Sequence, residues 1–252
     1  ITGNNATLHD KLLIGDNYVY IGYNGNENYT TAEHTDIYTV GKFNTTIIVN
    51  ATNITYGQDE IINVTVNSTA EGFIALRIGT QIFSSYIVNG KAQFNITGLP
   101  TGTYTANVTF FPTDDSIFNR NVTNVTFRVD PTTNYVMDVK VDNITYGQNA
   151  TIRVKVPTDA KGNVTIYVDG IAKGTVNITE GTAELIVAGL FGGEHVVNVT
   201  YNGDSSYAAK DKNNTFFMVN PTNNWDMSIT ATYAPYGEYS VITVKTAPYN
   251  LT

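Results

Sequence analysis

The sequence contains no cysteine, three histidines and one tryptophan, and only 14% of its residues are charged. Without cysteine the chain can form no disulfide, in whatever compartment it folds. The formal net charge of -8 comes without clusters of Lys and Arg. Such clusters are needed to bind nucleic acid and to dock on anionic lipid, so we expect neither partner.

Long apolar runs are also absent. No stretch approaches the roughly 18 apolar residues that a membrane-spanning helix needs, so we predict no membrane span in this segment. The chain starts at Ile1 without a charged and then apolar leader. We therefore expect this sequence to be a window of a longer chain.

Signals of catalysis are missing from the sequence. His9, His34 and His195 have no spacing that suits zinc, and we expect each at the surface or at a strand end. There is no Gly-x-Ser-x-Gly elbow and no cysteine nucleophile, and no acidic cluster recurs. The prediction is a protein that is not an enzyme and carries no organic cofactor.

The residues that are abundant favour β-structure. Hydrophobic residues make up 42% of the chain, enough for packed cores. β-branched and aromatic residues favour strands, whereas Asn and Gly favour turns. Apolar residues alternate with period two almost everywhere, and helical periodicity is absent. This pattern predicts an all-β fold.

A hexapeptide reveals an internal repeat. Asn-Ile-Thr-Tyr-Gly-Gln occurs at 53–58 and again at 143–148, and a worn copy occupies 234–238. The period of roughly 90 residues indicates tandem units. We interpret the hexapeptide as the turn between the first two strands of each unit, with Gly supplying backbone freedom.

Each unit contains about seven short strands, with a turn signal every 8–12 residues. This spacing favours a two-sheet sandwich of immunoglobulin type, with a barrel as the alternative. Asp169-Gly170 predicts a tight hairpin. The fold prediction is thus all-β, with tandem Ig-like antiparallel β-sandwiches joined by short linkers. The strand positions expected to face the core in the two complete copies are Ile62, Val64, Val66, Ile74, Leu76, Ile78, Ala92, Phe94, Ile96, Ala106, Val108, Phe110, Val125, Phe127 and Val129, matched by Ile152, Val154, Val156, Val164, Ile166, Val168, Ala183, Leu185, Val187, Val197, Val199, Tyr201, Phe217 and Val219.

The repeat also divides the chain. Pro131 and Pro221 mark unit ends, because proline cannot donate to a strand ladder. We predict the last strands of a preceding repeat at 1–41, whole repeats at 42–131 and 132–221, and the first strands of a following repeat at 222–252.

A second motif suggests a family. Tyr201-Asn-Gly-Asp-Ser-Ser-Tyr207, with the approach Leu99-Pro-Thr-Gly-Thr-Tyr104, resembles the bacterial and archaeal Ig-like repeat. Together with the Tyr-Gly turn it is similar to the long adhesin-like proteins of methanogenic archaea. That resemblance implies an extracellular, cell-surface stalk or adhesin, and it names no ligand. Two positions depart from the pattern: residues 110–115 lack the Tyr-Gly-Asp turn, and His195 stands where the first copy has Tyr104.

The two kinds of turn are expected at opposite ends of a sandwich, where successive units meet. We therefore predict interdomain turns at Tyr56, Gly57, Tyr146, Gly147, Tyr201, Gly203 and Tyr207. Calcium can bind between modules through acidic side chains. The candidates are Asp114, Asp115, Asp130, Asp142 and Asp204, with ordinary turn chemistry as the alternative.

About eighteen Asn-x-Ser/Thr triplets make glycosylation a further prediction, against the alternative that they follow from composition. Asn63, Asn107, Asn163 and Asn198 alternate with core residues, which places them on exposed faces. The candidate acceptors are Asn28, Asn44, Asn53, Asn63, Asn67, Asn95, Asn107, Asn121, Asn124, Asn143, Asn149, Asn163, Asn177, Asn198 and Asn213.

Three functional alternatives remain open beside the stalk: a filament subunit, a binding module, and a non-catalytic appendage of a surface hydrolase. The end segments could complete each other between chains and build a filament. Outward tyrosines such as Tyr18, Tyr20 and Tyr167 could bind host glycans or proteins. An intramolecular isopeptide crosslink at Lys140 is disfavoured, because this lysine alternates with core residues and should face solvent. The expected partners are neighbouring Ig-like repeats, host or partner-cell glycans or proteins, and like chains in a filament.

Overall fold

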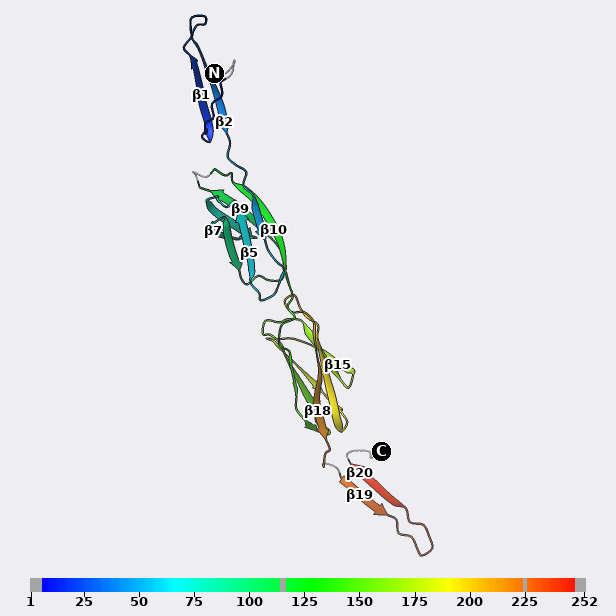
Figure 1. Ribbon diagram of the computed structural model, residues 1–252. Coiled ribbons are helices and arrows are strands. Elements are labelled where there is room, and N and C mark those ends of the chain that lie inside the picture. Colours follow the sequence, from blue (N-terminus) through cyan, green and yellow to red (C-terminus); the bar gives the residue numbers. More distant parts are fainter. Residues whose placement is uncertain (1–5, 114–116, 224–225, 248–252) are drawn as a thin grey trace. The chain divides into compact units, whose positions relative to one another are not determined.

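The structure, a computed structural model, describes residues 6–113, 117–223 and 226–247. Within these residues it consists of twenty β-strands and no helix, so no helix there is long and apolar enough to cross a membrane. The chain divides into two units, Ile1–Asp130 and Pro131–Thr252. Each unit holds one sandwich and one separate hairpin (Figure 1).

The first unit's smaller sheet is antiparallel. Its order is β3 (Ile47–Asn50), β5 (Glu60–Val66) and β8 (Lys91–Ile96). Along β5 the burial alternates strictly: Ile62 is 0% exposed and Ile61 is 49% exposed. One face of this sheet is therefore core and the other is wet, as the alternation predicts.

The larger sheet of the first unit has the order β4 (Ile54–Thr55), β10 (Asn121–Asp130), β9 (Gly102–Pro112), β6 (Gly72–Ile78) and β7 (Gln81–Tyr86). All its pairs are antiparallel except β4 with β10, which is parallel. Its inner face meets the smaller sheet in a core that includes Ile74, Leu76 and Phe110, each 0% exposed.

The second unit repeats this plan strand for strand. The smaller sheet has the order β11 (Asp138–Val141), β13 (Ala150–Lys155) and β16 (Thr182–Val187). The larger sheet has the order β12 (Ile144–Thr145), β18 (Lys210–Asn220), β17 (Gly193–Tyr201), β14 (Asn163–Val168) and β15 (Ile171–Asn177), and again only its first pair, β12 with β18, is parallel. This arrangement is an Ig-like β-sandwich, and the all-β tandem sandwich prediction is confirmed.

Two strands lack clear periodicity in the sequence. β7 and β15 are edge strands, and their side chains are exposed or half-buried. They follow tight hairpins, of which Asp169-Gly170 has φ values of 51° and 77° and joins Val168 to Ile171. The Asp-Gly hairpin prediction is therefore confirmed.

The first strand of each sandwich is split, which differs from the prediction. β3 pairs within the smaller sheet, whereas β4, made of the Ile and Thr of the hexapeptide, pairs with the last strand of the larger sheet. The hexapeptide is thus half strand and half turn. It carries the chain from the smaller sheet to the larger one. The side chains of its Asn and Gln accept hydrogen bonds from backbone N–H groups at this crossing.

The separate hairpins are β1 (Gly15–Tyr23) with β2 (Ala32–Val40), and β19 (Asp226–Ala231) with β20 (Ile242–Ala247). These are the strands predicted for partial repeats. Their apolar residues are largely exposed: Ile21 is 63%, Ile229 is 62% and Val244 is 53% exposed. The predicted boundaries of the partial repeats and the filament hypothesis stay predictions; light scattering at high protein concentration tests the latter.

Candidate functional site

The first candidate is the repeated hexapeptide, whose asparagine holds the last strand of its sandwich. Asn143 Oδ1 accepts a hydrogen bond from the Met218 backbone N–H at 2.8 Å. In the first copy, Asn53 Oδ1 accepts from the Arg128 N–H at 2.9 Å. The same side chain therefore satisfies the same backbone donor in both units.

The turn that follows is closed by its glutamine. The Thr145 N–H donates to Gln148 Oε1 at 2.8 Å, and the Gln148 N–H donates to the Thr145 carbonyl at 2.9 Å. Gly147 has φ +91°, a conformation that a side chain disfavours. Thr55 and Gln58 make the equivalent bonds in the first copy.

The tyrosine continues the parallel ladder. The Tyr146 N–H donates to the Asn220 carbonyl, and the Tyr56 N–H donates to the Asp130 carbonyl, both at 2.8 Å. Both tyrosines are half-buried. Each residue of the motif thus has a backbone role, because Ile and Thr pair with the last strand in the parallel ladder. The Tyr-Gly turn lies beside the end of its unit's last strand.

The Tyr201–Tyr207 turn forms the opposite end of the second sandwich. The Thr132 N–H, near the start of this unit, donates to the Ser206 carbonyl at 3.0 Å, and the Ala208 N–H donates back to the Thr132 carbonyl at 3.0 Å. The two kinds of turn therefore lie at opposite ends of the unit.

Three tyrosine rings pack together at this end. Tyr135 meets Tyr201 edge-on at 6.1 Å and Tyr207 at 5.2 Å between ring centroids. Tyr201 is 0% exposed, and its hydroxyl donates to the Lys161 carbonyl at 2.9 Å. Tyr207 is also buried, with its hydroxyl 2.7 Å from Asp159 Oδ1.

The burial of these rings limits what they can contact. Tyr201 and Tyr207 face the core of their own unit, while Gly203, in the turn between them, is half-buried. Burial raises the pKa of Tyr135 to about 12. The Tyr135 ring is therefore neutral at any ordinary pH. The contact between units through these turns stays a prediction.

Asp204, a calcium candidate, has both carboxylate oxygens occupied. Oδ1 accepts from the Ser206 and Tyr207 N–H groups at 2.7 Å each, and Oδ2 accepts from the Lys161 N–H at 2.6 Å. Burial works against its charge, but these donors and the Tyr201 hydroxyl hold the pKa of Asp204 below its ordinary value. This is the chemistry of an Asx turn.

Two other calcium candidates lie beside an arginine. Asp130 pairs with Arg128, and Asp142 lies 3.8 Å from Arg153. Asp114 and Asp115 fall outside the described residues. Across the described ranges, no three acidic or histidine side chains gather closely enough to hold an ion. Calcium binding stays a prediction, which a melting temperature with and without chelator tests.

His195 is the most buried titratable cation of the second unit. It lies two residues into β17, only 8% exposed, and its ring stacks on Phe217 with a centroid distance of 5.4 Å. The surface alternative of the prediction is therefore wrong, whereas the place of His195 near the start of β17 agrees with the strand-end alternative. Nδ1 is 2.6 Å from Asp169 Oδ2, and Nε2 is 2.9 Å from the Phe191 carbonyl.

The first unit fills this position with a tyrosine. Tyr104 stacks on Phe127 at 5.5 Å and donates from its hydroxyl to the Pro100 carbonyl at 2.7 Å. Like His195, it bonds a carbonyl four residues upstream, which is the tyrosine corner of Ig-type sandwiches. His195 is thus a structural substitute and not a catalytic base, because both of its nitrogens are committed.

Both bonds of His195 require the charged ring, since each nitrogen faces an acceptor. Burial disfavours that charge, but the Phe191 carbonyl and the Asp169 carboxylate outweigh it and raise the pKa of His195. Burial also opposes the charge of Asp169, yet the Val196 N–H and His195 lower the pKa of Asp169.

We predict that the second unit loses about 1–2 kcal/mol of unfolding free energy as the pH rises from 6 to 9. Because the pKa of His195 is higher in the folded state than in the unfolded state, its charged ring stabilises the fold fully at pH values below the unfolded-state pKa of about 6.5. This stabilisation is lost as the pH rises through the folded-state pKa. Asp169 acts at the other end: its contribution is lost as the pH falls below about 4. Urea unfolding at several pH values measures the change.

His195→Tyr is the matched control, because it installs the side chain of the first unit. A tyrosine gains no charge between pH 6 and 9, so the variant should lack this slope. Equal slopes for both proteins would contradict the assignment.

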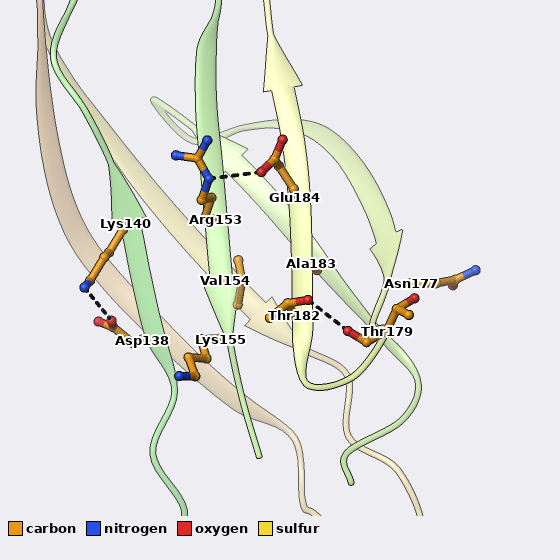
Figure 2. A pocket seen from close by; sticks show the side chains of 10 residues that line it. All are labelled: Asp138, Lys140, Arg153, Val154, Lys155, Asn177, Thr179, Thr182, Ala183 and Glu184. Carbon is orange, nitrogen blue, oxygen red and sulfur yellow. Dashed lines mark hydrogen bonds and ion pairs between the residues drawn. The ribbon is translucent and has the colours of Figure 1, made fainter. Parts of the chain in front are cut away.

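A hollow on the outer face of the smaller sheet of the second unit is another candidate (Figure 2). Its volume is about 570 Å³, and its lining residues include Lys140, Arg153, Lys155 and Glu184. Figure 2 shows Arg153 and Glu184 pointing toward each other from β13 and β16; Arg153 Nε donates to Glu184 Oε2 at 3.0 Å. Lys140 is 80% exposed, on the solvent face where the alternation places it.

The first unit has the same hollow with different chemistry. It measures about 300 Å³, and Gln93 Nε2 donates to Asn63 Oδ1 at 2.8 Å where the second unit has Arg153 and Glu184. Equivalent cross-strand positions are thus occupied by an ion pair in the second unit and by an amide pair in the first. Such exposed pairs are typical of cross-strand stabilisation, each contributing under about 1 kcal/mol.

The glycosylation candidates are mostly exposed. Asn67, Asn163 and Asn198 are half-buried, and each has its Oδ1 in a hydrogen bond, with the Thr46 N–H, the Asn202 amide and the Asn214 N–H respectively. The remaining candidates are exposed. Modification of these sites stays a prediction, which the intact mass of native protein tests.

A known family matches the second unit. The model of the bacterial Ig-like domain (group 3) matches residues 138–220, the stretch from β11 to β18. No curated protein matches the chain.

Several solved structures are similar at low identity. The fibronectin(III)-like modules of Clostridium thermocellum CbhA are 18% identical, with a TM-score of 0.30, over 70% of this chain and 95% of theirs. The Dpr11 IG1 structure bound to DIP-gamma is 13% identical, with a TM-score of 0.32, over 70% and 98%. A chimeric titin Z1Z2 tandem is 12% identical, with a TM-score of 0.26, over 71% and 99%. The Ig-like fold rests on the strand order and the family match rather than on these similarities.

Proposed function

We propose that this chain is part of a non-enzymatic, extracellular shaft on a prokaryotic cell surface, of the kind that the adhesin-like proteins of methanogenic archaea represent. The observation that carries the proposal is the connection between the units. β10 ends at Asp130, whose backbone carbonyl accepts a hydrogen bond from the Tyr56 N–H. The backbone of Thr132 is already hydrogen-bonded to Ser206 and Ala208 of the second sandwich. Only Pro131 lies between them, and one proline restricts bending far more than a flexible linker would.

The strand pairing at the ends of each sandwich suits a shaft under tension. β4 and β12 lie near the start of their sandwiches and pair in parallel with the last strands, β10 and β18. A force that pulls the two ends of a sandwich apart would therefore act parallel to these paired strands. It would load their backbone hydrogen bonds together, in shear, and not one after another. This pairing is parallel because the split first strand changes sheets.

Single-molecule stretching of the 252-residue chain tests this proposal. We expect two force-bearing unfolding events, each releasing the length of one sandwich. Asn143→Ala removes the acceptor for the Met218 N–H and should lower the force of one event only. Asn177→Ala, on edge strand β15, which pairs with neither β12 nor β18, is the control. Smooth extension without force-bearing events would overturn the shaft.

Localisation is tested separately, on intact native cells. Antibodies raised against the chain should label the cell surface without permeabilisation. Labelling that requires permeabilisation would contradict an extracellular shaft.

A further inference from the structure

Four side chains form a row across the outer face of the larger sheet of the first unit. Phe73 on β6 stacks on Phe111 of β9, with centroids 4.9 Å apart and planes at 11°. Tyr86 on β7 lies 6.4 Å from Phe73, and the Arg120 guanidinium lies 4.6 Å above Phe111. We call these four residues the aromatic row. It crosses three strand spacings, or about 14 Å.

The row is open to solvent at one end. Tyr86 is 80% exposed and Phe73 is 37% exposed. A hollow of about 270 Å³ lies here, lined by Phe73, Ser84, Ser85 and Tyr86. Aromatic surface and hydroxyl groups therefore share one concave site.

Small side chains lie beside the aromatic row. In register, Ala75 pairs with Ser84 on one side and with Thr109 on the other. The next outward position along β6 is Arg77, which pairs with Ile82. The outer face thus has aromatic rings on one side, the small residues Ser84, Ala75 and Thr109 in the middle, and Arg77 beside the exposed Ile82 beyond them. We call this part of the face the trough.

The second unit shows that the sandwich does not need these rings. The register positions of Phe73, Tyr86 and Phe111 are filled there by Asn163, Asn177 and Asn202.

Polar side chains bond one another on this face of the second unit. Asn202 donates to Asn163, and the Thr165 and Thr175 hydroxyls lie 3.1 Å apart. The same outer face is therefore a closed polar ladder in one unit and an open aromatic trough in the other.

We propose that the aromatic row binds a neutral pyranose oligosaccharide. The C–H faces of pyranose rings are apolar and stack on exposed aromatic rings, whereas their hydroxyls need hydrogen-bond partners nearby. Tyr86, which is 80% exposed, supplies the stacking face, and Phe73, one face of which is covered by Phe111, extends the apolar surface. Ser84 supplies a hydroxyl in the same hollow, and the Arg120 guanidinium supplies a polar group at the far end of the row. This role goes beyond the shaft and does not depend on it.

A sugar fits this trough better than a protein partner does. A stable protein interface needs roughly 800 Å² on each side with an apolar centre. Here the rings form a single row bordered by serine and threonine, and Asn107 and Asn124 lie opposite each other farther along the face. Narrow apolar strips flanked by hydroxyls match the alternating faces and edges of a sugar chain.

The test uses the whole chain made in a bacterial host, so that it carries no glycans. Hexamers of β-1,4-linked N-acetylglucosamine and of β-1,4-linked glucose are titrated by calorimetry and by amide NMR shifts. We expect saturable binding of at least one hexamer, with shifts at Tyr86 and Phe73. Tyr86→Asn, which copies Asn177 of the second unit, should weaken binding about tenfold or more and leave the fold intact because the side chain is 80% exposed.

Two further measurements keep the test decisive. Tyr167→Asn, on the outer face of the second unit, should leave the affinity unchanged. Absence of binding of both hexamers up to about 10 mM, or equal binding by the Tyr86→Asn variant, would overturn the proposal. Light scattering tests the alternative. If the chain forms a dimer and the Tyr86→Asn variant does not, the row is a protein contact instead.

Discussion

Replacing Gly72 with alanine is expected to destabilise the first unit by at least about 3 kcal/mol. Gly72 opens β6 at φ +144°, and a Cβ there would lie 2.1 Å from the Phe111 carbonyl oxygen and 2.9 Å from the Pro112 Cα. Both neighbours are backbone atoms of the paired strand β9. Relief therefore requires β6 and β9 to separate, which also disturbs the stacking of Phe73 on Phe111.

Gly57→Ala separates the steric effect from the conformational one. Gly57 also has positive φ, +87°, but a Cβ there would meet nothing within 4 Å. It should cost only about 1–2 kcal/mol, the price of a left-handed alanine. Urea unfolding of both variants measures the difference. Equal losses would mean that the approach of β6 to β9 is not tight, and would contradict the expected clash.

The core of each sandwich could be predicted because burial alternates along strands. Ile62, Ile74 and Val108 were assigned to the inner face from period two alone, and each is 1% exposed or less. The repeat strengthened this assignment, since Ile152 and Ile166 show the same parity and are 0% exposed. Alternation and repetition are properties of the sequence itself, so they predict the core directly.

The split first strand could not be predicted in this way. A strand of two residues such as β4 is too short to show any period. What stabilises it is a set of bonds between side chain and backbone, from Asn53 to Arg128 and from Gln58 to Thr55. Hydrophobic patterning does not record such bonds, so the hexapeptide was interpreted as a turn only.

His195 was missed because its burial depends on partners far along the chain. Its neighbours Glu194 and Val196 are exposed and half-buried, and the ring is enclosed by Asp169 and Phe217. The signal was present in the repeat: His195 occupies the position of Tyr104, whose role at the corner between strands is structural.

The aromatic row was missed for a related reason. Phe73, Tyr86 and Phe111 come from three strands, and only their register brings them together. A comparison of outward positions between repeats would have found them, because all three change to asparagine in the second unit.

Tyr201→Ala is expected to destabilise the second unit by about 3–5 kcal/mol, the usual cost of truncating a buried aromatic side chain. Tyr201 is 0% exposed, packs against Tyr135 and lies at the start of the turn that includes Asp204. Tyr201→Phe copies Phe110, the residue at this position in the first unit, and removes only the hydroxyl bonded to the Lys161 carbonyl. It should cost about 1 kcal/mol.

The ratio of these two losses distinguishes two roles for the Tyr201–Tyr207 turn. If the ring is a core group of its own unit, as its burial indicates, alanine is several times more damaging than phenylalanine. If the hydroxyl organises the turn through Lys161 and Asp204, the two losses are similar. Urea unfolding monitored by amide exchange of β17 measures both. Similar losses would show that the motif acts through its polar contacts, and the first unit, which has Phe110, would then need another way to hold its turn.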